Sequence, residues 1–341
     1  MKPKGPANMQ SGSSSLVVIR THYYDAEVAA FCDGFQRAGL DLVIAADESK
    51  NPVDVGPDFD KLSLTGPILC NLGLRPEPDF GWRCGDYALY VARGRYPSYR
   101  HYFLLEPDVF FNVPDLAALF RTIEEDRSSD LLACHLKRAA ATWYWYKPIF
   151  AYVPEVWRCL FSFIRVSGRG IDELLQKRID LSKLAMSDST LAARWPNDES
   201  FVASVLSSGD RFEHRDFKEI VPRLYTPLTF SFYEPFSRQA IERAGFDGQM
   251  YHPVLAGERF LHKTERLIAA ARETNSIRAY LIFSPKFFST LAIECGTDTA
   301  RELHSKVVGD LKGLGWSVAK LNALIAIRRI STMVRWYLRL L

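Results

Sequence analysis

Short apolar runs alternate with amphipathic segments over the first half of the chain. An apolar run begins at Leu16, and the segment that follows it carries apolar residues at helical spacing, namely Val28, Phe31, Cys32 and Phe35. A second apolar run then ends in Asp47. This order predicts a β-α-β unit, in which the two strands run parallel and the helix covers the sheet.

The alternation continues after a connection rich in Pro and Gly at 51–67. Residues 85–97 show a helical pattern, 99–109 form an apolar run typical of a buried strand, and a second amphipathic helix is expected over 115–124. The apolar segment 129–136 adds a further strand. We therefore expect an α/β fold, Rossmann-like, with a mostly parallel sheet flanked by helices.

The second half of the chain is less regular. A strand followed by a helix is expected over 161–178, and another helix begins near Asn197. Beyond 263 the pattern is mostly helical, while the first fifteen residues are polar and rich in Gly and Ser. We expect three parts, namely a disordered leader at 1–15, an α/β domain at 16–262 and a helical C-terminal region at 263–341.

The last thirty residues have a basic, amphipathic pattern. After Asp310 no acidic residue occurs, and the basic residues are Lys312, Lys320, Arg328, Arg329, Arg335 and Arg339. On a helix over 327–341 one face would carry Ile327, Ile330, Val334, Tyr337, Leu338 and Leu341. Two interpretations stay open: residues 312–341 contact an anionic membrane surface, or the apolar face docks on the protein's own core.

Composition restricts the class of protein. The 341 residues include 43 Lys and Arg against 40 Asp and Glu, and this net charge of +3 does not favour a nucleic-acid partner. The six cysteines show neither a CxxC pair nor zinc-site spacing, so we expect buried free thiols. The beginning of the chain lacks the apolar segment of a signal peptide, and no run is long enough to span a bilayer. We expect a cytoplasmic protein, with the inner face of the membrane as the site of any membrane contact.

The sequence Glu106-Pro107-Asp108 directly follows the apolar run at 99–105. Pro107 cannot continue a central strand, which places both carboxylates at the strand's carboxyl end, where α/β sheets bind ligands. Residues two apart on an extended chain point to the same side. Such a pair of oxygen ligands suits Mg²⁺ or Mn²⁺ shared with a phosphate-bearing substrate, although one acid could instead interact with a nearby helix N-terminus.

An acid after the second strand, Glu106-x-Asp108 after a later strand and Asn-Asp-Glu at a helix start together resemble a GT-A-type glycosyltransferase that uses nucleotide-sugars. The resemblance covers residues 16 to about 260, and the stretch 82–111 is similar to poorly characterised members that read W-x-x-GDY-x-x-Y and later E-x-DV. It implies a GT-A-like catalytic domain at 16–262. The implied reaction moves a sugar from a nucleotide diphosphate donor to a glycan or lipid-linked acceptor, as in polysaccharide biosynthesis, with Mn²⁺ or Mg²⁺.

The resemblance assigns roles to individual residues. Asp108 would bind the metal, and His252 would be a further metal ligand. Glu106 occupies the first position of the DxD motif, where the family usually has Asp, so its direct contact with the metal stays open. The residues expected to line the nucleotide-sugar are Thr21, His22, Asp47, Asp86 and Tyr87, in addition to Glu106. Without the resemblance, each of these could equally be a helix cap or a solvated loop residue.

The segment WPNDESF at 195–201 combines a cap with two acids. Either Asn197 or Asp198 could cap the helix that follows. The resemblance places at this position the carboxylate that takes a proton from the acceptor hydroxyl, so Asp198 or Glu199 is the expected catalytic base.

Three other classes compete with this interpretation. A phosphatase of the haloacid-dehalogenase type requires Asp as nucleophile at the first position, where this chain has Glu106. A nicotinamide dehydrogenase would carry G-x-G-x-x-G after the first strand, and the sequence RTHYYD at 20–25 has no glycine. A non-catalytic glycan-binding or membrane-associated scaffold protein stays open, since it would retain the aromatic run 143–146 and the basic tail.

Overall fold

The computed structural model describes residues 14–232 and 234–337, which form two compact units. The first unit comprises the chain up to Pro107 together with Asp115–Pro222, and the second comprises Asp108–Pro114 together with the chain from Arg223 onward. The boundary expected at 262/263 lies within a helix of the second unit. Residues 1–13 of the expected leader lie outside the described residues, and Ser15 is the first residue of a strand.

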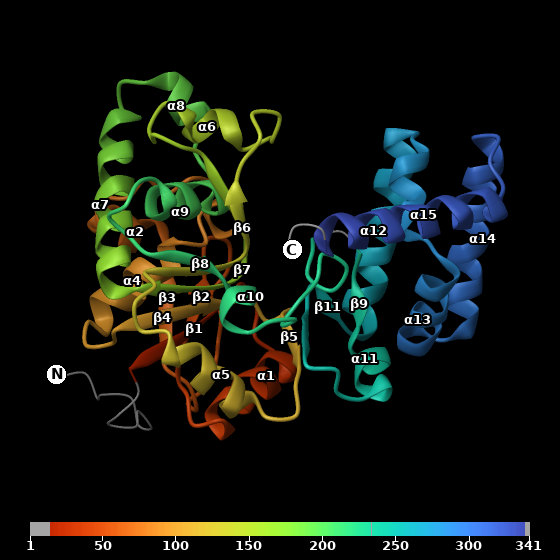
Figure 1. Ribbon diagram of the computed structural model, residues 1–341, viewed down its shortest axis with the longest axis horizontal. Coiled ribbons are helices and arrows are strands. Elements are labelled where there is room, and N and C mark those ends of the chain that lie inside the picture. The colour runs from red at the N-terminus through yellow and green to blue at the C-terminus, as the bar shows by residue number, and fades with distance from the viewer. Residues whose placement is uncertain (1–13, 233, 338–341) are drawn as a thin grey trace. The chain divides into compact units, whose positions relative to one another are not determined.

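A seven-stranded sheet forms the centre of the first unit, in the order β3-β2-β1-β4-β7-β6-β8 (Figure 1). Its strands are β1 (Ser15–Thr21), β2 (Asp41–Asp47), β3 (Lys61–Leu64), β4 (His101–Leu105), β6 (Leu131–Arg138), β7 (Trp157–Ser167) and β8 (His214–Asp216). Only β7 is antiparallel to its neighbours, β4 and β6. The predicted mostly parallel α/β sheet is confirmed, whereas β3, a short edge strand, was expected to be part of a connection.

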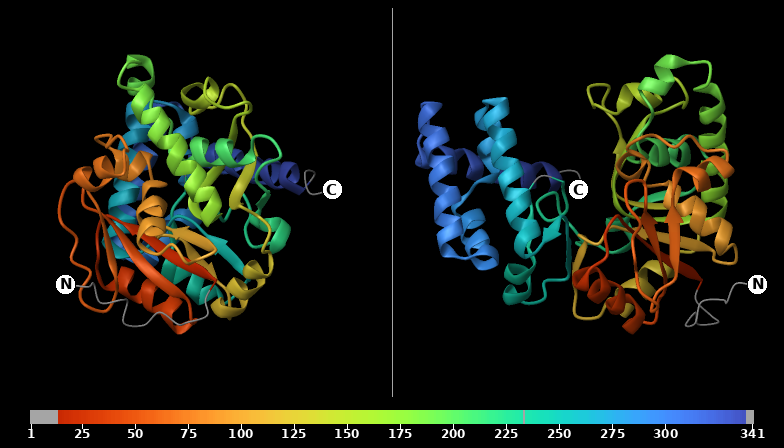
Figure 2. Two further views of the ribbon diagram at one scale, coloured as in Figure 1. Left: turned by 90° about the vertical axis from the view of Figure 1, so that its left-hand side faces the viewer. Right: turned by 180° about the vertical axis from the view of Figure 1, so that it is seen from behind.

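Helices cover both faces of this sheet (Figures 1 and 2). They are α1 (Ala26–Arg37), α2 (Gly66–Asn71), α3 (Phe80–Arg83), α4 (Tyr87–Arg95), α5 (Leu116–Glu125), α6 (Tyr146–Phe150), α7 (Gly168–Leu184), α8 (Ser189–Ala193), α9 (Asp198–Ser207) and α10 (Phe217–Ile220). Helices α4, α7 and α9 pack on one face. Helices α1, α5 and α10 lie on the other face. There Phe120 of α5 contacts Phe103 of β4, and Phe217 of α10 contacts Phe163 of β7. Phe35 of α1 packs against Phe120. Because helices cover it on both sides, β4 is buried throughout its length, and its residues after His101 are Tyr, Phe and two Leu.

The second unit contains two small sheets and a helical bundle. Strand β5 (Phe110–Asn112) pairs antiparallel with β10 (Gln249–Tyr251), and β9 (Phe236–Ser237) pairs parallel with β11 (Val254–Leu255). The helices are α11 (Arg238–Ala244), α12 (Gly257–Thr274), the 3-10 helix η1 (Ile277–Ile282), α13 (Pro285–Cys295), α14 (Thr297–Gly313) and α15 (Val318–Tyr337). Their apolar side chains form a separate core around Phe260, Phe287 and Leu303. The helical C-terminal region predicted from the sequence is therefore confirmed.

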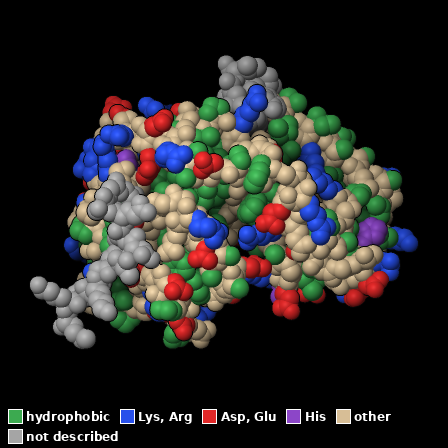
Figure 3. Space-filling view, turned by 90° about the horizontal axis from the view of Figure 1, so that it is seen from below, with side chains coloured by type: hydrophobic (Ala, Val, Ile, Leu, Met, Phe, Trp, Pro, Cys, Tyr) green, Lys and Arg blue, Asp and Glu red, His purple; other side chains and the backbone are tan. Residues whose placement is uncertain are grey.

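The surface carries charges of both signs. On the face seen in Figure 3, acidic and basic side chains are interspersed, in keeping with the small net charge. Among the described residues no helix combines the length and apolar character needed to cross a membrane. All six cysteines are free thiols, and four of them, Cys32, Cys84, Cys134 and Cys159, are buried as expected.

Candidate active site

Polar side chains of the first unit meet at the carboxyl ends of β1 and β4. Arg20, one residue before the end of β1, forms an ion pair with Glu106, which directly follows β4. Its guanidinium also donates to the Gly81 carbonyl at 3.0 Å and lies 3.8 Å from an Asp198 oxygen. The Arg20 side chain is only 10% exposed. One buried cation therefore supplies the counter-charge for two carboxylates at the edge where α/β sheets bind ligands.

Two glycines allow the segment around α3 to lie directly against these charged groups. A Cβ atom at Gly85 would overlap the Arg20 guanidinium and lie 2.7 Å from Asp198 Oδ2, and one at Gly81 would overlap the Asp47 carboxylate. The backbone N–H of Gly85 donates to Asp198 Oδ2 at 2.9 Å. Close approach of the backbone, rather than an unusual φ angle, explains why glycine is needed here.

Asp198 and Glu199 are the first two residues of α9, and neither of them caps the helix. Asn197 is the N-cap, since its side-chain oxygen accepts from the Ser200 N–H at 3.1 Å. Asp198 is left to accept from the N–H groups of Gly85 and Glu199, at 2.9 and 2.7 Å. The alternative of an Asn197 or an Asp198 cap is thus resolved in favour of Asn197.

Both of these acids hold their protons more tightly than usual. Burial raises the pKa of Asp198 to about 7, although the Arg20 charge opposes the rise. Burial and the neighbouring Asp198 charge raise the pKa of Glu199 to about 8, against the effect of Arg158. Carboxyl groups that titrate near neutral pH are suited to general acid and base catalysis.

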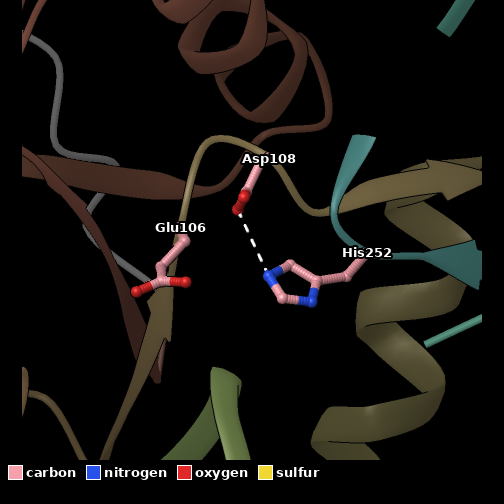
Figure 4. Close-up of side chains that lie close together, drawn as sticks. All are labelled: Glu106, Asp108 and His252. Carbon is pink, nitrogen blue, oxygen red and sulfur yellow. Dashed lines mark ion pairs between the residues drawn. The ribbon is translucent and has the colours of Figure 1, made fainter. Parts of the chain in front are cut away.

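Asp108 and His252 form a pair in the second unit (Figure 4). His252 Nε2 lies 3.5 Å from Asp108 Oδ1, and His252 Nδ1 lies 2.6 Å from the Ser231 carbonyl oxygen. A carbonyl can only accept, so Nδ1 carries a proton, and Nε2 is the ring nitrogen that faces Asp108. The backbone holds the pair together, because the Val254 N–H donates to the Asp108 carbonyl at 2.8 Å.

The Asp108–His252 pair has the features of a metal site. Asp108 Oδ1 is buried and has no hydrogen-bond partner within the described part of the chain. A carboxylate oxygen beside an imidazole nitrogen, with the second ring nitrogen bonded to a carbonyl, is a frequent ligand set for divalent transition metals. The residues present therefore fit a cation such as Mn²⁺.

Glu106 precedes Asp108 by two residues, so the chain itself keeps it near this pair. Glu106, Asp108 and His252 can each bring one ligand atom to within 4.8 Å of the others. Glu106 already has Arg20 as an ion-pair partner, whereas Asp108 Oδ1 has no hydrogen-bond donor among the described residues. The geometry thus favours Asp108 as the primary ligand.

Two cations were not identified from the sequence. Arg20 could have been found, because a charged residue in an otherwise apolar strand needs a buried counter-charge. The second cation is Lys263 on α12. Burial and the charge of Arg266 lower the pKa of Lys263, and the nearby Asp108 charge opposes this change. Nothing in the sequence distinguishes Lys263 from other basic residues on helices.

Three residues expected near the nucleotide lie where the sequence places them, at the ends of β1 and β2. Thr21 is buried and its hydroxyl donates to the Tyr23 carbonyl at 2.6 Å, while His22 is exposed. One oxygen of Asp47 accepts from the Ser49 N–H at 2.9 Å. A role for Thr21, His22 and Asp47 in nucleotide binding stays a prediction.

Asp86 and Tyr87, also expected to line the nucleotide, lie in the interior of the first unit. Both are fully buried, and Asp86 binds Arg178 through its two oxygens and accepts from Tyr90 at 2.6 Å. The Tyr87 hydroxyl donates to the Arg75 carbonyl at 2.9 Å. Their polar atoms are bonded within the protein, because the buried Arg178 requires a counter-charge. This geometry favours a structural role for both residues over contact with the nucleotide.

The aromatic run 143–146 divides between core and surface. Trp143 and Tyr146 pack against the core of the first unit. Tyr144 is 79% exposed and contacts Trp145, with ring centroids 4.7 Å apart. Trp145 in turn lies 5.9 Å from Trp82 of α3, which is 67% exposed. These three residues, Trp82, Tyr144 and Trp145, are here called the aromatic platform. Trp82 directly follows Gly81, whose carbonyl accepts from Arg20.

Comparison with known protein families and with curated proteins gave no match. Among solved structures, one similar chain is a glycosyltransferase involved in the glycosylation of the major capsid of PBCV-1. The two sequences are 12% identical, the match covers 70% of this chain and 91% of that chain, and the TM-score is 0.34. Mouse xyloside xylosyltransferase 1 in its apo form shows 7% identity, coverage of 70% and 96%, and a TM-score of 0.37. The mannosyltransferase Ktr4p from S. cerevisiae shows 10% identity, coverage of 61% and 70%, and a TM-score of 0.35. Similarities this low assign no function to this chain.

Proposed function

We propose that the protein is a glycosyltransferase that moves a hexosyl or related sugar from a nucleotide diphosphate donor to a glycan or lipid-linked acceptor, with Mn²⁺ or Mg²⁺. The observation that carries this proposal is the buried Asp108 Oδ1, which lacks a hydrogen-bond donor among the described residues and lies beside His252 Nε2. A carboxylate a few residues beyond the carboxyl end of a parallel strand, as Asp108 is beyond β4, is well placed for a ligand at the sheet edge.

Asp108 and His252 would hold the cation, with Glu106 as a third ligand from the same turn of chain. When bound there, the ion supplies positive charge that stabilises the departing diphosphate. Lys263, whose pKa responds to Asp108, is a second source of positive charge for the phosphates. Thr21, His22 and Asp47, at the ends of β1 and β2, are proposed to bind the nucleoside part of the donor.

Glu199 is the better candidate for the catalytic base, and Asp198 for the residue that positions it. Asp198 is buried and bound by two backbone N–H groups, which fix its orientation. Glu199 is only half-buried, and its raised pKa of about 8 lets it accept a proton near neutral pH from an acceptor hydroxyl. The base would then lose that proton to solvent after the sugar has been transferred.

The aromatic platform supports a carbohydrate acceptor. Flat rings with exposed faces stack on the apolar C–H faces of sugars, and Trp82 and Tyr144 are both well exposed. Trp82 follows Gly81, whose backbone touches the Asp47 carboxylate and accepts from Arg20. A sugar stacked on this platform would thus lie next to the segment that contacts Asp47, one of the residues proposed to bind the nucleoside.

Calorimetric titration of the full chain with uridine and guanosine diphosphates, with and without Mn²⁺, tests the proposal. We expect metal-dependent binding of at least one diphosphate, and a loss of at least about tenfold in affinity in Asp108→Ala and His252→Ala. Asp298→Ala is the matched control, because this second-unit carboxylate is 96% exposed and should not affect binding.

Two results would refute the proposal. Either no diphosphate binds, or binding is indifferent both to the metal and to Asp108. Binding of oligosaccharides without any nucleotide binding would instead favour a non-catalytic glycan-binding protein, to which the aromatic platform is equally suited.

A further inference from the structure

Helix α15 has two different apolar faces. On the first, Leu321 and Ile325 are buried in the core of the helical bundle. One helical turn further on, the Arg329 guanidinium donates to both oxygens of Glu234 at 2.9 Å. This face packs the first part of α15 against the second unit, in agreement with the interpretation that an apolar face docks on the protein's own core.

The opposite face of α15 is apolar and faces solvent. Its exposed residues, three or four apart along the helix with one adjacent pair, are Ala319, Ala323, Ala326, Ile327, Ile330 and Val334. Ile327, Ile330 and Val334 are 64%, 66% and 51% exposed. A stripe of this length is unusual on the surface of a soluble domain and marks a site of contact.

The charged side chains of α15 next to the stripe are basic. Lys320 and Arg328 are both exposed, and no acidic residue follows Asp310 in the sequence. Arg328 lies toward the side of the helix that carries Arg329, where its charge also acts on Glu234. An apolar stripe with a basic border matches the interface of a bilayer, which offers acyl chains below and anionic headgroups above.

We propose that the exposed face of α15 binds the surface of an anionic lipid bilayer, with the helix axis in the plane of the membrane. The helix is not apolar enough to cross the bilayer, which agrees with this orientation. The two interpretations of the sequence are thereby combined, because one face docks on the bundle and the other remains available for lipid. The proposal is independent of the proposed catalytic function and goes beyond it.

Sedimentation of the full chain with lipid vesicles tests this proposal. We expect binding to vesicles of phosphatidylcholine mixed with phosphatidylserine, little binding to phosphatidylcholine alone, and weaker binding as salt concentration rises. The triple variant Ile327→Ser, Ile330→Ser, Val334→Ser should bind at least about tenfold more weakly. Arg328→Glu with Lys320→Glu should remove most of the preference for anionic vesicles.

Met186→Ser is the matched control, since Met186 is 88% exposed and lies in the first unit, and it should bind vesicles like the wild type. All substituted positions are exposed, so the variants should unfold at the wild-type temperature. Equal binding by the triple variant and the wild type, or no binding to anionic vesicles, would overturn the proposal. If the wild type instead formed a dimer in solution and did not bind vesicles, and Ile330→Asp converted that dimer to a monomer, a second copy of the chain would be shown to cover this face. Diphosphate binding would be unaffected in every case.

Discussion

Asp86 and Arg178 form a two-point ion pair in the interior of the first unit. Arg178 Nε lies 2.8 Å from Asp86 Oδ2, Arg178 Nη2 lies 3.0 Å from Asp86 Oδ1, and neither side chain is exposed. Arg178 Nη1 also donates to the Pro196 carbonyl at 2.9 Å, directly before Asn197 and Asp198. The pair therefore connects the start of α4 to the segment that carries the proposed catalytic acids.

Replacing Asp86 by Ala should destabilise the protein by about 3–5 kcal/mol, because an unpaired guanidinium would be left buried. Urea unfolding measures this change. Asp172→Ala is the control, since Asp172 pairs with Arg93 at the surface and is worth at most about 1 kcal/mol. Equal losses in the two variants would contradict a buried structural role for Asp86.

Arg20→Met should raise the pKa of Asp198 further, because the Arg20 charge is what opposes the effect of burial. The methionine retains most of the side-chain volume but provides no positive charge for Asp198 and Glu106. Titration of the carboxyl groups followed by carbon NMR should show the shift, and Arg20→Lys should restore part of the original value. An unchanged titration of Asp198 in Arg20→Met would refute this coupling.

Stability should decrease between about pH 4 and pH 8, since the pKa values of Asp198 and Glu199 are raised in the folded state, to about 7 and about 8. In this range the unfolded chain releases protons that the folded chain still holds, so ionisation favours unfolding. For Asp198 the loss is up to about 4 kcal/mol, at about 1.4 kcal/mol per pKa unit. Denaturant unfolding at a series of pH values measures the slope, and Asp198→Asn should reduce it. A slope in Asp198→Asn as steep as in the wild type would count against the raised pKa.

Gly85→Ala should destabilise the protein by about 1–3 kcal/mol, because its Cβ would displace the Arg20 guanidinium or the Asp198 carboxylate. Gly94→Ala is the matched control, since Gly94 lies in α4 with no atom within 4 Å of the added Cβ. That substitution should stabilise the helix by about 0.5–1 kcal/mol. Thermal unfolding compares the two, and opposite signs are expected.

The elements of the sheet could be predicted because burial on both faces leaves continuous apolar runs, as in β4. Strand β3 could not, since a short edge strand with the exposed Lys61 does not differ in pattern from a polar connection. The strand-end position of Asp108 followed from Pro107 and the adjacent apolar run. Asp86 can be buried because it pairs with Arg178, ninety-two residues further along the sequence. A single sequence does not reveal such a distant partner. Likewise, only the backbone geometry distinguishes Asn197 from Asp198 as the cap.

The chain leaves the first unit after β4, contributes β5 to the second, and returns at Asp115. A fragment that ends at Pro222 would thus contain β5 without its partner β10, and the fragment 223–341 would contain β10 with an unpaired edge. When expressed separately, the two fragments should reassemble by strand addition, as in a split protein. Asp108 and His252 lie on different fragments, so recovery of the proposed Mn²⁺ binding would report that reassembly directly.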